Sequence, residues 1–130
     1  MKIEHLALNV SEPLAMADWY ETHLGLTAVK KMQESPYMTF LADDSGKIMI
    51  EIYQNTNATV LAFDSLDPLM LHLAFVSANP ADDARRLVDA GAREVSDDTL
   101  PDGTRLIMLR DPWGLAVQLV KRAQALLPNP

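Results

Sequence analysis

The sequence predicts an α+β fold made of two βαβββ modules in tandem. Two observations support this prediction: short runs with strand-like alternation surround two helical stretches, and the second half of the chain repeats the first. Each helical stretch has proline at its start and glycine just past its end, the usual asymmetry of helix termini. The expected helices span residues 13–24 and 80–90, and the expected strands span 2–10, 26–32, 37–42, 47–54, 69–77, 92–96, 104–110 and 115–121.

The repeat has a fixed offset of 67 residues. At this offset polar residues align as well as apolar ones, which chance similarity between two βα segments seldom produces. The aligned pairs are His5 with His72, Leu6 with Leu73, Pro13 with Pro80, Ala17 with Ala84, Asp44 with Asp111, and Glu51 with Gln118. We therefore expect a single domain over residues 1–130, with module 1 at about 1–54, a linker at 55–68 and module 2 at about 69–121.

The first helix illustrates how local signals set these boundaries. Ser11 is expected to be its N-cap, Pro13 suits its first turn, and Gly25 ends it. An apolar stripe of Ala17, Tyr20 and Leu24 should run along it.

The composition excludes several classes of partner and site. Hydrophobic residues make up 48% of the 130-residue chain, which is enough for an ordinary core. The formal net charge is −7 and there is no basic run, which argues against nucleic acid or an anionic membrane as partner. The chain has no cysteine, so disulfides and thiolate metal sites are excluded. No segment has the apolar length of a membrane span, and the charged N-terminus does not suit a signal peptide, so we expect a cytoplasmic protein.

Strand alternation places four polar side chains away from the predicted helices. The last strand of each module has one aliphatic face that is expected to pack on a helix, formed by Ile48, Ile50 and Ile52 and by Leu115, Val117 and Leu119. The opposite faces carry Glu51 and Gln118, and the first strand of each module carries His5 or His72 on its matching face. A carboxylate among apolar neighbours is costly without a partner, so we expect the four side chains to converge on one cavity.

These four side chains offer two imidazoles, one carboxylate and one amide oxygen. Such a donor set suits a divalent metal with room for water or substrate. Imidazole is a borderline donor, which favours Ni, Zn, Co, Mn or Fe over Ca, and no organic cofactor is expected. Two alternatives stay open at this point: a buried hydrogen-bonded network, and a wet pocket without metal.

Four segments of the chain are also typical of a known family. They are IEHLALNV at 3–10, WYETHLGL at 19–26, LHLAFV at 71–76 and RDPWGLAVQLV at 110–120. On these residues the sequence resembles the vicinal oxygen chelate superfamily, which includes glyoxalase I, bleomycin resistance proteins and extradiol dioxygenases. The resemblance covers nearly the whole chain, and it implies the glyoxalase/bleomycin resistance/dioxygenase fold and a homodimer.

By that resemblance the metal ligands fall on His5, Glu51, His72 and Gln118, and Glu51 is the plausible internal base. Gln118 stands where relatives commonly have a glutamate, and an amide has no useful basicity for proton transfer. The resemblance implies one of two functions. The first is a divalent-metal-dependent lyase, isomerase or dioxygenase-type enzyme acting on a small molecule. The second is a metal-free protein of the bleomycin-resistance type that binds or sequesters a small molecule.

Several charged residues lie outside this set. Arg105 and Arg110 flank the penultimate strand and could meet an anionic substrate, although a solvated strand end is the simpler interpretation of Arg110. The acidic run of Asp97 and Asp98, with Asp102, is typical of a solvated loop. The segment 111–114 (DPWG) predicts a type I turn.

Overall fold

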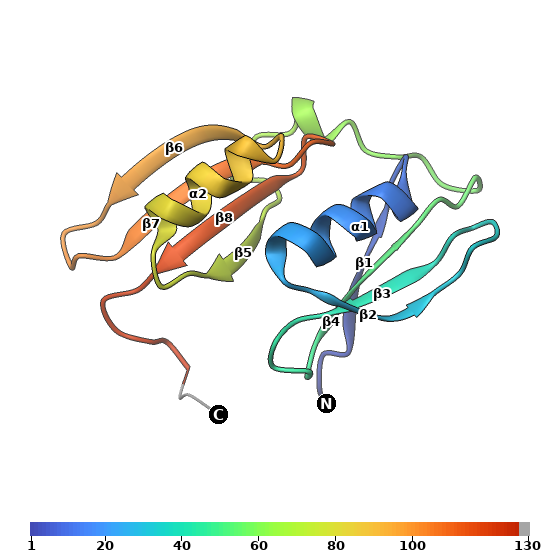
Figure 1. Ribbon diagram of the computed structural model, residues 1–130, viewed down its shortest axis with the longest axis horizontal. Helices are drawn as coiled ribbons and strands as arrows, with labels where there is room; N and C mark the ends of the chain where they lie inside the picture. The colour runs from blue at the N-terminus through green and yellow to red at the C-terminus, as the bar shows by residue number, and fades with distance from the viewer. Residues whose placement is uncertain (128–130) are drawn as a thin grey trace. The chain divides into compact units, whose positions relative to one another are not determined.

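The computed structural model describes residues 1–127 and contains two compact units, Met1–Leu61 and a second unit that begins at Ala62. Each unit has one α-helix and one four-stranded mixed sheet, in the chain order βαβββ (Figure 1). The predicted α+β fold with two βαβββ modules is confirmed.

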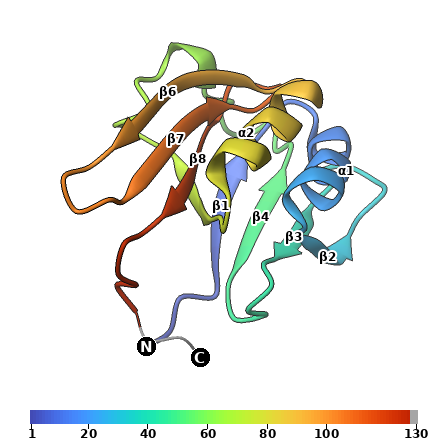
Figure 2. The same ribbon diagram turned by 60° about the vertical axis from the view of Figure 1, so that its left-hand side comes forward.

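The first unit is a sheet with one helix over it. Its elements are β1 (His5–Asn9), α1 (Pro13–Leu24), β2 (Thr27–Lys31), β3 (Thr39–Ala42) and β4 (Met49–Tyr53). The strands lie side by side in the order β1-β4-β3-β2, with β1 parallel to β4 and the other neighbours antiparallel. A parallel pair needs a long crossover, and α1 is part of that connection and covers one face of the sheet (Figure 2).

The second unit repeats this arrangement. A short 3₁₀ helix, η1 (Phe63–Ser65), precedes β5 (Leu73–Val76), α2 (Pro80–Asp89), β6 (Arg93–Thr99), β7 (Arg105–Arg110) and β8 (Ala116–Lys121). Its strands follow the order β5-β8-β7-β6, again with the first and last strands of the unit parallel. The helix α2 contacts β6, β7 and β8.

The two sheets share their register as well as their order. Ala7 of β1 lies opposite Glu51 of β4, and Ala74 of β5 lies opposite Gln118 of β8. Both pairs are related by the 67-residue offset found in the sequence. The edge pairs β2–β3 and β6–β7 also share an irregularity, because the register shifts at residues 28–30 and again at 94–96.

Local signals predict the helix ends well, with one exception. Gly25 ends α1 in the left-handed conformation (φ 72°), and its N–H donates to the carbonyl of Tyr20. The predicted N-cap at Ser11 is wrong. Glu12 holds that position without a capping hydrogen bond from its side chain, while the Ser11 carbonyl accepts from Gln54 Nε2 at 3.0 Å. In α2 the expected kind of cap is present, since the Asn79 side chain accepts from the Asp82 N–H.

Apolar residues at alternate strand positions form the core beneath each helix. Leu8 and Ile52 lie opposite each other in β1 and β4 and are 7% and 0% exposed. The predicted helix-facing residues Leu115, just before β8, and Val117 and Leu119, within it, are likewise buried. Ile48 differs, because it precedes β4 and is 39% exposed.

The strand predicted at 69–77 begins later, at Leu73. A turn occupies the preceding residues: the Met70 N–H donates to the Asp67 carbonyl, and the Leu69 N–H donates to the Asp67 carboxylate, both at 2.8 Å. Aspartate followed by proline is a favourable turn start, and here it overrides the apolar run that predicted a strand.

The predicted solvated loop at Asp97 and Asp98 is also wrong, because both residues lie in β6. Asp97 accepts two hydrogen bonds from Arg105 of the neighbouring strand, from Nε at 2.9 Å and from Nη2 at 2.6 Å. These bonds hold the pKa of Asp97 below its ordinary value. The guanidinium of Arg105 is therefore paired with Asp97 of the neighbouring strand.

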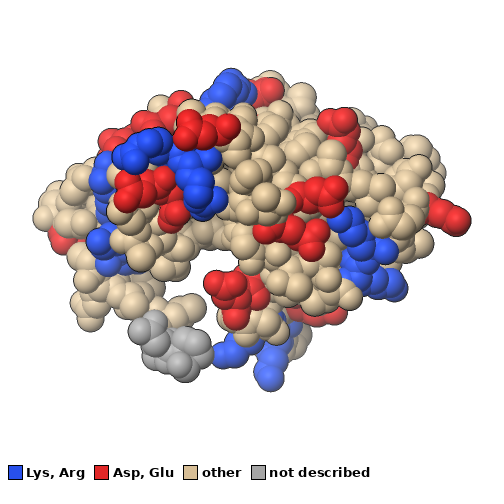
Figure 3. All heavy atoms as spheres, in the orientation of Figure 1, with Lys and Arg blue, Asp and Glu red and all other residues tan. Residues whose placement is uncertain are grey.

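Charged side chains of opposite sign lie beside one another on the surface. Lys31 contacts Asp18 at 2.5 Å and Glu21 at 3.4 Å, and Arg86 contacts Asp83 at 3.2 Å. The face drawn in Figure 3 shows the same mixture of acidic and basic groups. In the described part of the chain, no helix combines the length and apolar character that crossing a membrane requires.

We predict that Leu8→Asp and Leu119→Asp each abolish the cooperative thermal transition. Either change buries a charge beneath a helix and should cost more than about 4 kcal/mol of the free energy of unfolding. Val76→Asp is the matched control, because Val76 is 93% exposed and the same kind of change there should leave the fold intact. Circular dichroism melts check all three. A folded Leu119→Asp protein would mean that the faces of β8 are reversed.

Candidate functional site

The first unit brings two of the predicted site residues together. Ala7 of β1 lies opposite Glu51 of β4, and His5 comes two residues before Ala7 on the same face of the strand. The His5 Nε2 atom lies 3.1 Å from Glu51 Oε2. The sheet face that α1 leaves open therefore carries an adjacent imidazole and carboxylate.

The surroundings of Glu51 are largely shielded from water. Its side chain is 12% exposed, and its neighbour on β3 is Phe40. The ring of Phe40 meets the His5 ring edge-on, with centroids 5.5 Å apart. Phe40 thus limits where the imidazole can lie, and a carboxylate buried to this degree needs a partner or a cation.

The second nitrogen of His5 also faces a carboxylate. Nδ1 lies 2.7 Å from Oε2 of Glu4, so the ring sits between two acidic side chains. An imidazolium satisfies both contacts by donating to each. A neutral ring that donates from Nδ1 to Glu4 instead turns its Nε2 lone pair toward Glu51, an arrangement that leaves room for a shared cation.

The spacing of this pair fits two ligands of one metal ion. Two ligands at roughly 2.0–2.2 Å from one metal ion lie about 3.4 Å apart in a tetrahedral site and about 3 Å apart at right angles in an octahedral site. The observed 3.1 Å between His5 Nε2 and Glu51 Oε2 falls near these separations, and it is also the length of a direct N–H···O contact. The donors are an imidazole and a carboxylate, which suit zinc and its neighbours in the first transition row.

In the second unit, His72 lies immediately before β5 and is half-buried. Its Nδ1 atom lies 2.7 Å from the carbonyl oxygen of Pro68. A carbonyl can accept but cannot donate, so Nδ1 carries the proton. In the neutral ring the Nε2 lone pair then remains to bind a metal or to accept from a ligand.

Gln118 occupies the position in β8 that matches Glu51. It is half-buried, with Ala74 and Met108 as its neighbours on the adjoining strands. Within residues 1–127, no protein group forms a hydrogen bond with its side-chain amide. Its oxygen and its N–H groups are therefore available to a ligand.

The structure thus joins His5 to Glu51, and it describes His72 and Gln118 in the other unit. Among residues 1–127, no group of three or more His, Asp or Glu side chains is arranged to hold a metal ion. The convergence of all four predicted ligands on one point stays a prediction.

Arg110 has a role that the sequence did not reveal. It is half-buried rather than solvated, so the predicted solvated strand end is wrong. Nη1 donates to the carbonyls of Phe63 and Gly114 at 2.9 and 3.0 Å, and Nη2 donates to the carbonyl of Leu66 at 2.8 Å. Backbone carbonyls of a distant segment leave no pattern in a sequence, and for this reason sequence analysis missed the role.

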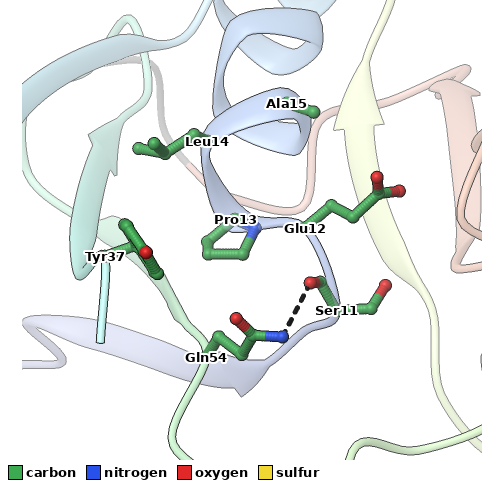
Figure 4. Close-up of a pocket in the computed structure, with 7 residues that line it drawn as sticks. All are labelled: Ser11, Glu12, Pro13, Leu14, Ala15, Tyr37 and Gln54. Carbon is green, nitrogen blue, oxygen red and sulfur yellow. Dashed lines mark hydrogen bonds between the residues drawn. The ribbon is translucent and has the colours of Figure 1, made fainter. Parts of the chain in front are cut away.

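A shallow hollow lies elsewhere in the first unit, at the N-terminal end of α1 (Figure 4). Its volume is about 200 Å³, and the hydrogen bond from Gln54 to the Ser11 carbonyl crosses one side of it. The residues lining it are Ser11, Glu12, Pro13, Leu14, Ala15, Tyr37 and Gln54. None of the predicted ligands lines this hollow, which lies beyond the last residue of β1 whereas His5 is the first.

Comparison with known proteins places this geometry in context. Residues 2–119 match the family described as the Glyoxalase/Bleomycin resistance protein/Dioxygenase superfamily. No match was found among curated proteins.

Several solved structures share the fold at low sequence identity. A superfamily member from Sphaerobacter thermophilus DSM 20745 has a TM-score of 0.68 and 15% identity, and the match covers 94% of this chain and 98% of that chain. TnmS3, an antibiotic binding protein from Streptomyces sp. CB03234, has a TM-score of 0.70 and 16% identity, with 92% and 93% covered. A glyoxalase-related enzyme from Fulvimarina pelagi has a TM-score of 0.69 and 17% identity, with 92% and 87% covered.

We predict that His5 and Glu51 are energetically coupled. His5→Leu should lower the free energy of unfolding by about 1–3 kcal/mol, because it leaves the shielded Glu51 carboxylate without a partner. Glu51→Leu should be neutral or stabilising, since it removes a desolvated charge. The double variant should therefore be at least as stable as His5→Leu. Urea unfolding of the four proteins measures the coupling, and strictly additive effects would show that the 3.1 Å contact has no energetic weight.

Proposed function

The chain belongs to the Glyoxalase/Bleomycin resistance protein/Dioxygenase superfamily, and from this premise we propose that it acts on a small molecule with the help of a divalent metal ion. The proposed ligands are His5, Glu51, His72 and Gln118. The observation that carries the proposal is the 3.1 Å approach of His5 Nε2 to Glu51 Oε2 on the sheet face opposite α1. The favoured ions are Ni, Zn, Co, Mn and Fe.

Each proposed ligand has a separate task. When bound, the ion would serve as a Lewis acid that polarises an oxygen of the substrate. His5 and His72 would hold it through their Nε2 atoms, since Nδ1 of each ring faces an oxygen of Glu4 or Pro68.

Glu51 is the carboxylate of the set and the proposed internal base. Its 12% exposure limits competition from water for a proton taken from the substrate. Gln118 can supply a neutral oxygen but cannot take up a proton at ordinary pH. Glu51, in the first unit, would therefore carry out the proton transfer. The reaction would be that of a lyase or an isomerase, or of dioxygenase type.

A second candidate function is metal-free binding or sequestration of a small molecule. The observation that favours it is the character of the second sheet around Gln118. The neighbours of this residue on the same face include Met108, Ala116 and Val120, which are apolar and no more than 6% exposed. An apolar face with one free amide suits an organic ligand, and a protein of similar fold, TnmS3, is described as antibiotic binding.

We also propose that the protein is a homodimer, as the resemblance to the superfamily implies. Size-exclusion chromatography with light scattering would test this, because a chain of 14.4 kDa and its dimer are readily separated. A monomer at all concentrations would contradict the proposal without affecting the ligand set.

Calorimetric titration with Ni²⁺ and Zn²⁺ tests the metal proposal. We predict that Gln118→Glu binds more tightly than wild type by about tenfold or more, because a second anionic oxygen adds attraction in a partly desolvated site. His72→Ala should abolish binding, since it removes one of the two imidazoles. His23→Ala is the matched control, because His23 lies in the last turn of α1 and is not a proposed ligand.

The outcomes separate the two functions. Tight binding of a metal ion by wild type that is lost in both His5→Ala and His72→Ala supports the metal-dependent function. Equal or absent affinity in wild type, Gln118→Glu and His72→Ala would overturn it and leave the metal-free binding protein.

A further inference from the structure

Segment 63–70, at the start of the second unit, is tied to the second sheet by Arg110. Arg110, the last residue of β7, holds the carbonyls of Phe63 and Leu66 at 2.9 and 2.8 Å. The same guanidinium holds the Gly114 carbonyl at 3.0 Å. Three neutral acceptors on one half-buried cation fix the start of this segment against the turn after β7.

A second contact supports the same segment. Asp64 of η1 pairs with Arg93 of β6. The carboxyl group of Asp64 also lies directly over Gly114, where an added Cβ would come within 2.5 Å of Asp64 Cγ. Glycine is therefore required at 114 for close approach as well as for its φ of 88°.

The end of the segment determines where His72 points. Asp67 closes a turn through its own carbonyl and carboxylate, which bind the N–H groups of Met70 and Leu69. This turn brings the Pro68 carbonyl to 2.7 Å from His72 Nδ1. A continuous path of hydrogen bonds and short chain segments thus leads from Arg110 to the His72 ring.

The path has a chemical consequence at His72. Neutral histidine in water favours the tautomer with its proton on Nε2. The Pro68 carbonyl reverses this preference, because it can only accept and so stabilises the proton on Nδ1. Nε2 then presents a lone pair in a direction set by the carbonyl.

We propose that Arg110 is a positioning residue that acts through segment 63–70 to hold His72 as the Nδ1–H tautomer, with Nε2 as the binding atom. This inference rests on the proposed function, because it assumes that His72 is one of the residues that bind the ligand. It adds a residue to that site that itself touches no ligand. It also names the atom of His72 that meets either a metal or an N–H or O–H group of an organic ligand.

Imidazole ¹⁵N chemical shifts test the proposal directly, since they distinguish protonated from unprotonated ring nitrogens. The experiment uses the full chain without ligand, at a pH at which His72 is neutral, with His72→Gln to assign its signals. Wild type should show a protonated Nδ1 and an unprotonated Nε2. Arg110→Met, which retains the aliphatic stem but loses the three hydrogen bonds, should move both shifts toward the Nε2–H form.

Arg105→Met is the matched control, because it removes a guanidinium from the same strand that pairs with exposed Asp97 instead. It should leave the His72 shifts unchanged. Where Arg110→Met does not fold, Asp67→Ala decides, because Asp67 is exposed and its loss loosens only the turn at Pro68. Nickel titration of the same proteins should show affinity reduced by about 10- to 100-fold in Arg110→Met and unchanged in Arg105→Met.

The two proposals can fail separately. An Nε2–H tautomer in wild type, or His72 shifts that a folded Arg110→Met leaves unchanged, would overturn the positioning role. If Arg110→Met does not fold, unchanged His72 shifts in Asp67→Ala would overturn it. Correct tautomers and a clear effect of Arg110→Met, together with no nickel binding in wild type, would overturn the metal function and leave the positioning role intact.

Discussion

The parallel pairing of the first and last strand in each module is the constraint on which the rest of the structure depends. Parallel neighbours require a crossover, which places a helix on one face of the sheet, and the opposite, open face carries the predicted site residues. The register Ala7 to Glu51, and its repeat Ala74 to Gln118, then decides which side chains the open face carries. Burial of Leu8 and Ile52 beneath α1 maintains that register, because a slip of one residue would exchange the faces.

The open faces differ in character although their backbones match. In the first unit the imidazole of His5 lies between two carboxylates, whereas in the second unit His72 is held by a neutral carbonyl and Gln118 has replaced the carboxylate. Of the two matching strand positions, only the one in the first unit therefore carries a carboxylate. Such charge is tolerated because each group has a partner within hydrogen-bonding distance, and it lies on the face that the helix-packed core does not need.

Much of the fold could be predicted from the sequence because the two patterns that indicate it, strand alternation and the repeat of the module, are both periodic. Strand alternation and the 67-residue offset together identify the two modules, and they also place His5 and Glu51 on one face. The predictions that were wrong failed for two other physical reasons. Some residues contact others that are remote in sequence, and elsewhere a turn forms where an apolar run predicted a strand. Arg110 binds carbonyls some 44 to 47 residues away, and Asp67 converts an apolar run into a turn. The contact of His72 with Pro68 follows from that turn, so periodicity could not predict it.

The duplicated register has a consequence for how such a protein can change over evolutionary time. Each module has its own sheet, its own helix and its own apolar core, so each of the two matching positions, Glu51 and Gln118, lies on a sheet supported by its own module. The two half-sites are thus free to drift independently, and one copy can keep an acidic group while its twin exchanges it for an amide. Gene duplication followed by such asymmetric drift offers a route to new ligands, since the helix-packed faces of both modules can keep their apolar residues while one polar position changes.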